Sequence, residues 1–204
     1  MDRTPPDLEH AVVLNDMERL QGARYVLPKR RHDWLLGRWV AKRLLGEMLG
    51  EMPHILQATS GAPFVVGHPE LNVSISHSGD YAFCAALWNT RLGVDIEQVT
   101  PHTPEFIEDY FTSAERKLIQ YAPDYMPTLL WSAKEAALKA LHLGLRVDTR
   151  SVNIMPSAPA TSLASGWQPL SADCGLHGTL SGWWRLMHNY VLTIAVQETE
   201  RRPL

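Results

Sequence analysis

The segment Gly93-Val94-Asp95-Ile96-Glu97 places two carboxylates two residues apart in an otherwise apolar run. In a β-strand, Val94 and Ile96 would face a core, and Asp95 and Glu97 would share the opposite face with Cα atoms about 7 Å apart. Such carboxylates repel each other unless they are solvated, paired with bases or bridged by a cation. The pair therefore indicates either a solvated sheet face or a site for a divalent cation that prefers oxygen ligands, such as Mg²⁺.

A further carboxylate lies on a predicted helix from Met126 to Leu143, which Gly144 would end. This helix is apolar on almost every side. Polar residues recur along it at spacings of three and four: Thr128, Ser132, Glu135, Lys139 and His142. A helix of this kind should be buried, so its narrow polar stripe must face polar groups or a site. Glu135 and Lys139 form either an ordinary i,i+4 ion pair or part of that site.

A Ser-His-Ser motif, Ser76-His77-Ser78, ends a segment that alternates strictly from Leu71 to Ser76. The alternation predicts a strand, with residues 77–80 as the turn and residues 81–88 as the return strand. Hydroxyl and imidazole groups in this turn would suit an anion. A Ser–His nucleophilic pair is less favoured because no nucleophile-elbow glycine pattern surrounds either serine. Taken alone, the motif favours a plain turn over either function.

The charge of the chain is unevenly distributed. The whole chain carries −3, but residues 19–43 hold eight basic residues and one acid, Asp33, which gives this segment +7 and the remainder −10. The basic residues are Arg19, Arg24, Lys29, Arg30, Arg31, Arg38, Lys42 and Arg43. The segment favours a local anion site, whereas a general nucleic-acid binder would need a larger basic face.

The 204 residues fit one large domain or two halves of about 100 residues each. At 45% apolar and 20% charged residues, the composition is that of a globular protein. No apolar stretch approaches the roughly 18 residues that span a membrane, and the N-terminal residues lack a signal-peptide pattern. Cys84 and Cys174 lack metal-ligand spacing, so we expect free thiols in a reduced, cytoplasmic protein.

The remaining patterns predict the elements that would position the polar groups. They are a helix at 33–50, strands near residues 55, 64–66 and 92–97, a helix opened by the capping box Thr112-Ser113-Ala114-Glu115, short strands within 151–184, and a last strand at 190–196. Residues 1–18 have little periodicity, and we expect a loop or an edge strand there. This mixture of helices and strands predicts an α+β fold.

One short sequence echo is present. Trp39-Val40-Ala41-Lys42 in the first predicted helix resembles Trp131-Ser132-Ala133-Lys134 in the second. Four residues with one mismatch indicate either an internal duplication or a coincidence.

Taken together, Asn72-x-Ser-x-Ser-His-Ser, Gly-Val-Asp-Ile-Glu and Trp131-Ser-x-Lys-Glu-x-x-x-Lys resemble, in this order, the motifs of the Sfp-type 4′-phosphopantetheinyl transferases. The resemblance spans about residues 19–144. It implies a monomeric pseudo-dimer of two similar α+β halves with the active site at their junction, and we divide the chain into residues 1–92 and 93–204. It also implies Mg²⁺-dependent transfer of 4′-phosphopantetheine from coenzyme A to a serine of an acyl carrier protein or a peptidyl or aryl carrier domain, with release of 3′,5′-ADP.

The resemblance assigns catalytic roles. Asp95, Glu97 and Glu135 would hold Mg²⁺ against the coenzyme A diphosphate. Glu135, or a metal-bound water beside it, would take the proton from the carrier serine. Lys139 would contact the phosphate and help the leaving group, and His77 would bind a phosphate oxygen.

The resemblance also implies contacts along the nucleotide. Ser76 would lie beside His77 at the phosphate, and Gly61-Ala62-Pro63 would form a loop along the nucleotide. Arg24 and, as a second candidate, Arg19 would meet the 3′-phosphate. The segment Phe111-Thr112-x-x-Glu115 matches a family pattern at the start of a helix near which carrier proteins dock.

Two positions depart from the family pattern. Many relatives have lysine where this chain has Ala62, so a side-chain contact to coenzyme A is lost. Gln21 stands where a basic residue is common, which leaves the 3′-phosphate partner open among Arg19, Arg24 and Arg31.

Two other functions fit parts of the pattern. A Mg²⁺-dependent nuclease also uses Asp, Glu and Lys, but usually as an acid-x-Lys pair on a strand, whereas Gln98 and Val99 follow Glu97 here. A non-enzymatic binder of acidic partners would use residues 19–43 and ignore Mg²⁺. We favour the transferase and expect neither nucleic acid nor a membrane as a partner.

Overall fold

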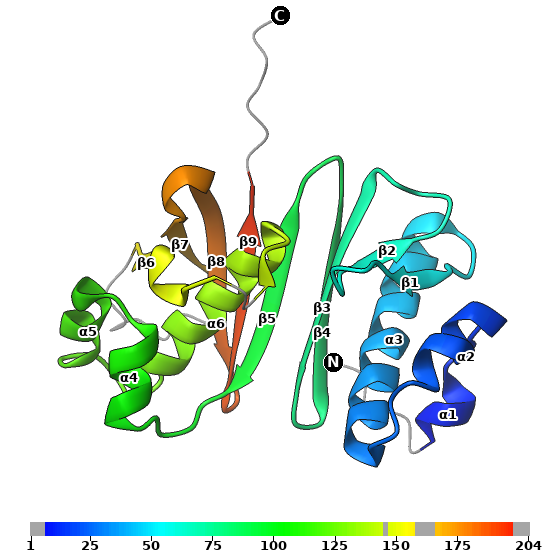
Figure 1. Cartoon of the computed structure of the whole chain (residues 1–204), viewed down its shortest axis with the longest axis horizontal. Coiled ribbons are helices and arrows are strands. Elements are labelled where there is room, and N and C mark those ends of the chain that lie inside the picture. The colour runs from blue at the N-terminus through cyan, green and yellow to red at the C-terminus, as the bar shows by residue number, and fades with distance from the viewer. Residues whose placement is uncertain (1–6, 145–146, 158–165, 198–204) are drawn as a thin grey trace, which may run out of the picture.

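The computed structural model describes residues 7–144, 147–157 and 166–197, which form two mixed helix-and-sheet halves side by side (Figure 1). The first half contains α1 (Leu8–Ala11), α2 (Asp16–Gly22), α3 (Pro28–Leu49), β1 (Ile55–Gln57), β2 (Pro63–Val65), β3 (Leu71–Ser78) and β4 (Tyr81–Trp88). The second half contains β5 (Leu92–Gln98), α4 (Pro104–Tyr110), α5 (Ser113–Ile119), α6 (Met126–Ala140), β6 (Asn153–Pro156), β7 (Gln168–Asp173), β8 (Thr179–Met187) and β9 (Tyr190–Val196). The α+β prediction is confirmed, and the boundary between residues 92 and 93 stays a prediction.

The second half is built on a five-stranded antiparallel sheet with the order β5-β9-β8-β7-β6. Helix α6 packs on this sheet, mainly against β5 and β9 (Figure 1). Their shared core includes Leu129, Leu130, Leu170, Leu180 and Val191. Burial of a helix that is apolar on almost every side provides a strong driving force for this arrangement. In the described residues no helix is long and apolar enough to cross a membrane.

Gly93 in β5 determines how closely α6 approaches the sheet. A Cβ atom at this position would lie 1.9 Å from the carbonyl oxygen of Ala136 and 2.5 Å from the amide nitrogen of Ala140. Both distances are far below van der Waals contact, so only glycine permits the packing. The close approach brings Glu135 and Lys139 of α6 over β5.

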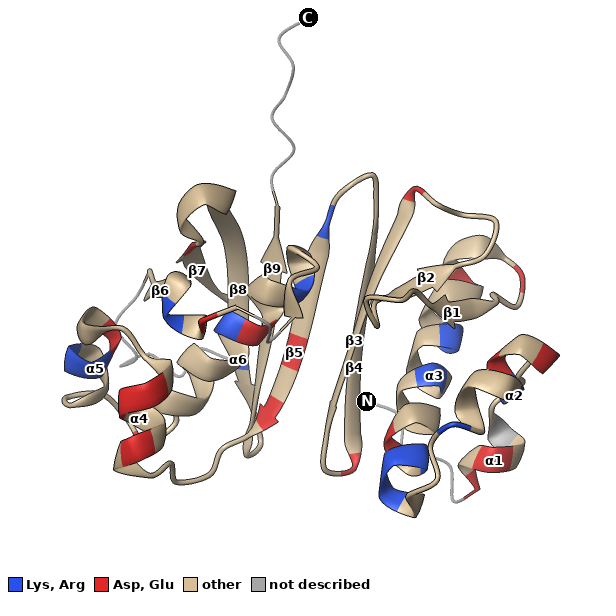
Figure 2. Cartoon of the chain, viewed as in Figure 1, with Lys and Arg blue, Asp and Glu red and all other residues tan. Residues whose placement is uncertain are grey.

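The first half surrounds α3 with two antiparallel hairpins, β1–β2 and β3–β4. Buried Ala41 and Leu45 of α3 share a core with Ile55, Val65 and Leu71. This packing places the N-terminal half of α3 beside β3 and β4, where Figure 2 shows a concentration of basic residues.

Residues 8–11 form α1 and residues 16–18 begin α2, so the prediction of a loop or an edge strand was wrong for these residues. Residues 12–15 form a loop between the two helices, and residues 1–6 lie outside the described residues. Asn15 caps α2 in a reciprocal capping box, accepting from the amide of Glu18 at 2.8 Å while the Glu18 carboxylate accepts from the amide of Asn15 at 2.8 Å. Helices this short offer too few turns for a visible period, and the Asn-x-x-Glu capping box was the available signal.

Three predicted boundaries also shift. Helix α3 begins at Pro28, before the predicted Asp33, because proline suits the first helical turn. Strand β3 continues through Ser78, so His77 belongs to the strand and not to the turn. Helix α6 ends at Ala140, a few residues earlier than predicted.

Lys42 of α3 forms a buried ion pair that fastens α3 to α2. Its Nζ lies 2.9 Å from Oε1 of Glu18 and donates to the carbonyl oxygen of Pro53 at 2.7 Å. The same carboxylate oxygen accepts from the amide of Ile55 at 2.9 Å. One glutamate thus caps α2, pairs with α3 and anchors β1.

Lys134 of α6 repeats this arrangement in the second half. Its Nζ lies 2.9 Å from Oε2 of Glu115 and donates to the carbonyl oxygens of Thr149 and Val152. Glu115 completes a capping box on α5 and accepts from the amide of Ile154 at 2.8 Å. Lys42 and Lys134, which end the two similar tetrapeptides, thus make the same kind of contact in their respective halves. This favours an internal duplication over a coincidence.

Serine side chains of β3 join the two halves. β5 is an edge strand of its sheet, and its exposed amides need partners. The amide of Val94 donates to Ser74 Oγ at 3.0 Å, and that of Gln98 donates to Ser78 Oγ at 3.2 Å. Hydroxyl groups thus replace a backbone ladder at the junction.

We predict that Gly93→Ala strongly destabilises the protein, by about 3 kcal/mol or more, because its methyl group would force α6 away from β5. Gly46→Ala is the matched control. A Cβ at this helical position meets only ordinary contacts, the nearest at 3.6 Å, so it should stabilise by about 0.5–1 kcal/mol. Urea unfolding of both variants measures the difference. Equal stability of Gly93→Ala and wild type would contradict the proposed contact.

Candidate active site

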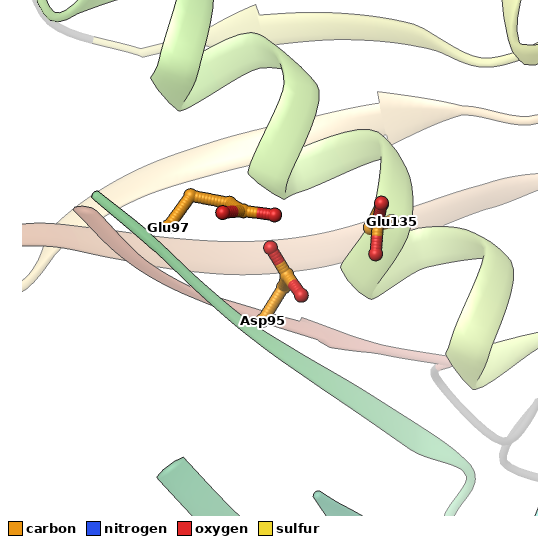
Figure 3. Close-up of side chains that lie close together, drawn as sticks. All are labelled: Asp95, Glu97 and Glu135. Atoms are coloured by element: carbon orange, nitrogen blue, oxygen red, sulfur yellow. The ribbon is translucent and has the colours of Figure 1, made fainter. Parts of the chain in front are cut away.

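Three carboxylates converge where α6 crosses β5. Asp95 and Glu97 project from the same side of β5, and Glu135 reaches them from α6 (Figure 3). One oxygen from each lies within 4.8 Å of the others. Asp95 is only 1% exposed, so the cluster is not a solvated sheet face.

Lys139 is the counter-charge of this cluster. Its Nζ lies 2.5 Å from Oδ1 of Asp95 and 3.5 Å from Oε2 of Glu135, and it donates to Ser76 Oγ at 3.1 Å. Burial works to lower the pKa of Lys139, but the carboxylates of Asp95 and Glu135 outweigh it and the pKa lies above its ordinary value. One ammonium group faces three carboxylates.

The cluster retains an excess of negative charge. Burial, and then the carboxylates of Asp95 and Glu135, raise the pKa of Glu97 to about 7. Burial, with the charge of Asp95, also raises the pKa of Glu135. A bound cation would reverse both effects.

The donor set fits a divalent cation such as Mg²⁺. Oδ1 of Asp95 is taken by Lys139 and by the hydroxyl of Ser76, which donates to it at 2.7 Å. Oδ2 of Asp95 is buried and has no hydrogen-bond partner. A buried carboxylate oxygen needs a donor or a cation, and the oxygens of Glu97 and Glu135 supply the further hard ligands that Mg²⁺ prefers.

Two adjoining pockets lie along the loop that contains Gly61, Ala62 and Pro63. The first pocket extends from this loop to Lys139 and His142. The second lies on the side of α3, and Gly61, Pro63 and Ile75 line both. Its other lining residues are Tyr25, Arg30, Asp33, Trp34, Gly37, Arg38, Gln57 and His77. The predicted loop thus contributes residues to both pockets, one of which Lys139 lines.

Ser76 and His77 face different partners. Ser76 donates to Asp95 beside the carboxylates, whereas His77 lines the second pocket with its Nδ1 3.9 Å from Oδ2 of Asp33. Burial, only partly offset by Asp33, lowers the pKa of His77. Neighbouring strand residues point to opposite faces, so the two side chains meet different groups, and their contact with one phosphate stays a prediction.

The predicted phosphate ligands Arg19 and Arg24 are both exposed and line neither pocket. Arg19 forms an ion pair with Asp16 at 3.4 Å, and Arg31 pairs with Glu9. Arg30 and Arg38 line the second pocket in their place. Sequence reasoning missed Arg38, although its position four residues after Trp34 already placed both on one helical face.

The polar stripe of α6 divides between several roles. Thr128 hydrogen-bonds to His102 at 3.0 Å, and Ser132 to Thr193 at 2.9 Å. These two residues therefore satisfy buried partners, while Glu135 and Lys139 face the carboxylate site.

The segment from Phe111 to Glu115 is also structural in this chain. Phe111 and Glu115 are 0% and 1% exposed, and Thr112 donates to Oδ1 of Asn153 at 2.8 Å. Phe111 and Glu115 thus hold α5 in place from inside the fold, whereas Ser113 and Ala114 between them are exposed. Docking of a carrier near this helix stays a prediction.

Family comparisons agree with this geometry. Residues 91–195 match the family model of the 4′-phosphopantetheinyl transferase superfamily, and residues 19–87 match that of the 4′-phosphopantetheinyl transferase N-terminal domain. The chain belongs to the 4′-phosphopantetheinyl transferase superfamily. It is a transferase, which sets aside the nuclease and the non-enzymatic binder.

The transferase is similar to several curated proteins. It is 26% identical over 174 residues to the 4′-phosphopantetheinyl transferase HetI of Nostoc, covering 78% of this chain and 73% of the relative. It is 28% identical over 190 residues to a putative 4′-phosphopantetheinyl transferase of Synechocystis, covering 81% and 76%. A 4′-phosphopantetheinyl transferase of Bacillus subtilis is 31% identical over 98 residues, covering 46% and 43%.

We predict that Glu97→Gln stabilises the transferase at pH 8 in buffer with a chelator. The pKa of Glu97 is about 7 in the folded protein and has the ordinary value of 4.5 in the unfolded chain. Between these two pH values the unfolded chain loses this proton first, so the free energy of unfolding falls as the pH rises. The gain should be about 1–2 kcal/mol at pH 8, reduced by partial solvent exposure, and near zero at pH 4. Urea unfolding across this pH range measures it.

The exposed Glu47→Gln of α3 is the matched control and should leave the pH profile of stability unchanged. If Glu97→Gln and wild type had the same free energy of unfolding at every pH, burial and the neighbouring carboxylates would not raise the pKa of Glu97.

Proposed function

We propose that the transferase moves 4′-phosphopantetheine from coenzyme A to a serine of an apo acyl carrier protein or of a peptidyl or aryl carrier domain, depends on Mg²⁺, and releases 3′,5′-ADP. The observation that carries this proposal is the cluster of Asp95, Glu97 and Glu135 beside Lys139, with one buried Asp95 oxygen free. The family membership gives the class of group that is transferred. Relatives named 4′-phosphopantetheinyl transferase support the same reaction.

The transfer exchanges one phosphorus–oxygen bond for another. The serine oxygen of the carrier attacks the phosphorus that bears pantetheine, and the bond to the bridging diphosphate oxygen breaks. The serine proton must go to a base, and 3′,5′-ADP leaves with the bridging oxygen. The reaction needs alignment of the two oxygens and neutralisation of phosphate charge more than it needs covalent chemistry.

We assign the metal ligands to Asp95, Glu97 and Glu135. A Mg²⁺ ion held there would neutralise charge on the diphosphate oxygens. Oδ2 of Asp95 would be the metal ligand, because it has no hydrogen-bond partner whereas Oδ1 already accepts from Lys139 and Ser76. Ser76 is then a positioning residue that fixes the Asp95 carboxylate.

We assign the proton transfer to Glu135, directly or through a water beside it. Its carboxylate reaches the cluster from α6 and so lies beside the place proposed for the metal and the diphosphate. Lys139, four residues later on α6, supplies positive charge to the leaving diphosphate oxygen. Both side chains are held by the same helix, so their spacing is fixed.

The nucleotide would follow the loop from Gly61 to Pro63. Lys139 and this loop line the first pocket, and Gly61 and Pro63 of the same loop line the second pocket together with His77. With Ala62 in the loop, backbone and Pro63 make these contacts and no lysine side chain contributes. A monomeric state stays a prediction.

We predict that the transferase, incubated with coenzyme A, Mg²⁺ and an apo carrier protein, adds one phosphopantetheine group to the carrier, which intact-mass spectrometry detects. A chelator should abolish the transfer. Glu135→Gln should slow it by about 100-fold or more, because it removes the base and a metal ligand.

Glu47→Gln is the control variant. It removes an exposed carboxylate of α3, outside the carboxylate cluster, and should transfer at the wild-type rate. No mass gain on acyl, peptidyl or aryl carriers would refute the proposed function. A wild-type rate for Glu135→Gln would refute the site assignment alone.

A further inference from the structure

Three serines alternate along β3 and project from the face of this strand that meets β5. They are Ser74, Ser76 and Ser78, and each forms a hydrogen bond with a residue of β5. Both strands advance by about 7 Å every two residues, so the contacts stay in step along the junction. Ser76 consequently meets Asp95. Two residues later, Ser78 meets Glu97.

Ser78 holds one oxygen of the Glu97 carboxylate. Its Oγ accepts from the amide of Gln98 at 3.2 Å and donates to Oε2 of Glu97 at 3.3 Å. A serine hydroxyl has a single hydrogen, and an N–H donor on its oxygen directs that hydrogen to another acceptor. The contact with Gln98 thus aims the hydroxyl at Glu97, and it leaves Oε1 of Glu97 for a cation.

Ser76 repeats this pattern at the neighbouring carboxylate. Its Oγ accepts from Nζ of Lys139 at 3.1 Å and donates to Oδ1 of Asp95 at 2.7 Å. The other oxygen, Oδ2 of Asp95, is the buried atom without a hydrogen-bond partner. At both carboxylates a serine of the first half therefore occupies one oxygen and leaves the other for the metal site.

The fold does not require the hydroxyl of Ser78. Gln98 is exposed, so water can satisfy its amide if Ser78 is replaced. Ser74 differs, because its hydrogen bond with the amide of Val94 is buried and its loss would leave that amide unpaired. In the described parts of the chain, Ser74 has no hydrogen bond to a carboxylate. Ser74 is thus explained by the fold, whereas Ser78 is not.

We propose that Ser78 is a positioning residue for the divalent cation. It fixes the carboxylate of Glu97 before the cation binds, and so it reduces the rotamer freedom that Glu97 must lose on binding. The first half of the chain then sets the metal affinity of a site whose three carboxylates all belong to the second half (Figure 3). This inference rests on the proposed role of Asp95, Glu97 and Glu135 as metal ligands.

Electron paramagnetic resonance of free Mn²⁺, titrated into the protein with one equivalent of coenzyme A and no carrier, measures the metal affinity. Ser78→Ala should weaken it by about tenfold, which is the usual cost of losing a group that orients a metal ligand. Ser78→Thr keeps the hydroxyl, and threonine suits a strand, so this variant should bind Mn²⁺ within about twofold of wild type.

Ser74→Ala is the matched control, because it removes a hydroxyl from the same face of β3. It should bind Mn²⁺ within about twofold of wild type, since Ser74 orients no carboxylate. In urea it should unfold more easily than wild type because the buried amide of Val94 loses its acceptor. Ser78→Ala should unfold at nearly the wild-type urea concentration. These opposite effects separate positioning of Glu97 from general loosening of the junction.

The transfer reaction supplies a second readout. Ser78→Ala should raise the Mg²⁺ concentration that gives half of the maximal rate by about tenfold, in line with its weaker metal affinity. The rate at saturating Mg²⁺ should stay nearly unchanged, because the ligands themselves are present. A displaced catalytic group would lower the rate at saturating Mg²⁺ instead.

Wild-type Mn²⁺ affinity in Ser78→Ala would overturn the proposal, as would an equal loss of affinity in Ser78→Thr or in Ser74→Ala. Each of these results would leave the proposed transferase reaction intact. If Ser78→Ala lost Mn²⁺ affinity as expected but wild type modified no carrier, the proposed reaction would fail and the role of Ser78 would stand. If wild type bound no Mn²⁺, the metal site and the role of Ser78 would fail together.

Discussion

The contact between Gly93 and the backbone of α6 is the constraint on which the rest of the site depends. It lets an apolar helix lie directly on β5 and places Glu135 and Lys139 over Asp95. The glycine of the Gly-Val-Asp-Ile-Glu motif therefore serves packing and not a turn. A strand and a helix that are distant in sequence become one rigid support, and rigid support is what precise metal and phosphate chemistry needs.

The buried charges of the protein fall into two kinds. Lys42 and Lys134 are each paired with a glutamate that also caps a helix, so these charges are compensated and stabilise each half. Asp95 and Arg38 each retain buried polar atoms without partners. A cation held by the carboxylate cluster would account for the Asp95 oxygen.

Local patterns in the sequence predicted much of this arrangement. Alternation along β5 placed Asp95 and Glu97 on one face, and the narrow stripe of α6 indicated that Glu135 faces a polar site, because both properties depend on periodicity within one element. The short helices before Pro28 were missed, since a few turns show no period. The end of β3 was predicted too early, since the strand continues through Ser78 and includes His77. The burial of Arg38 depends on how α3 packs against β3 and β4, which no single segment specifies.

The central claim is that the junction carboxylates hold a divalent cation against the diphosphate of coenzyme A. Electron–nuclear double resonance on Mn²⁺, used in place of Mg²⁺, measures this contact through the coupling between the ion and phosphorus nuclei. The account predicts a ³¹P coupling in wild type with coenzyme A, under conditions where free Mn²⁺ binds little of the ligand, and its loss in Asp95→Asn. An unchanged coupling in Asp95→Asn, or a protein-bound ion without any ³¹P coupling, would contradict it.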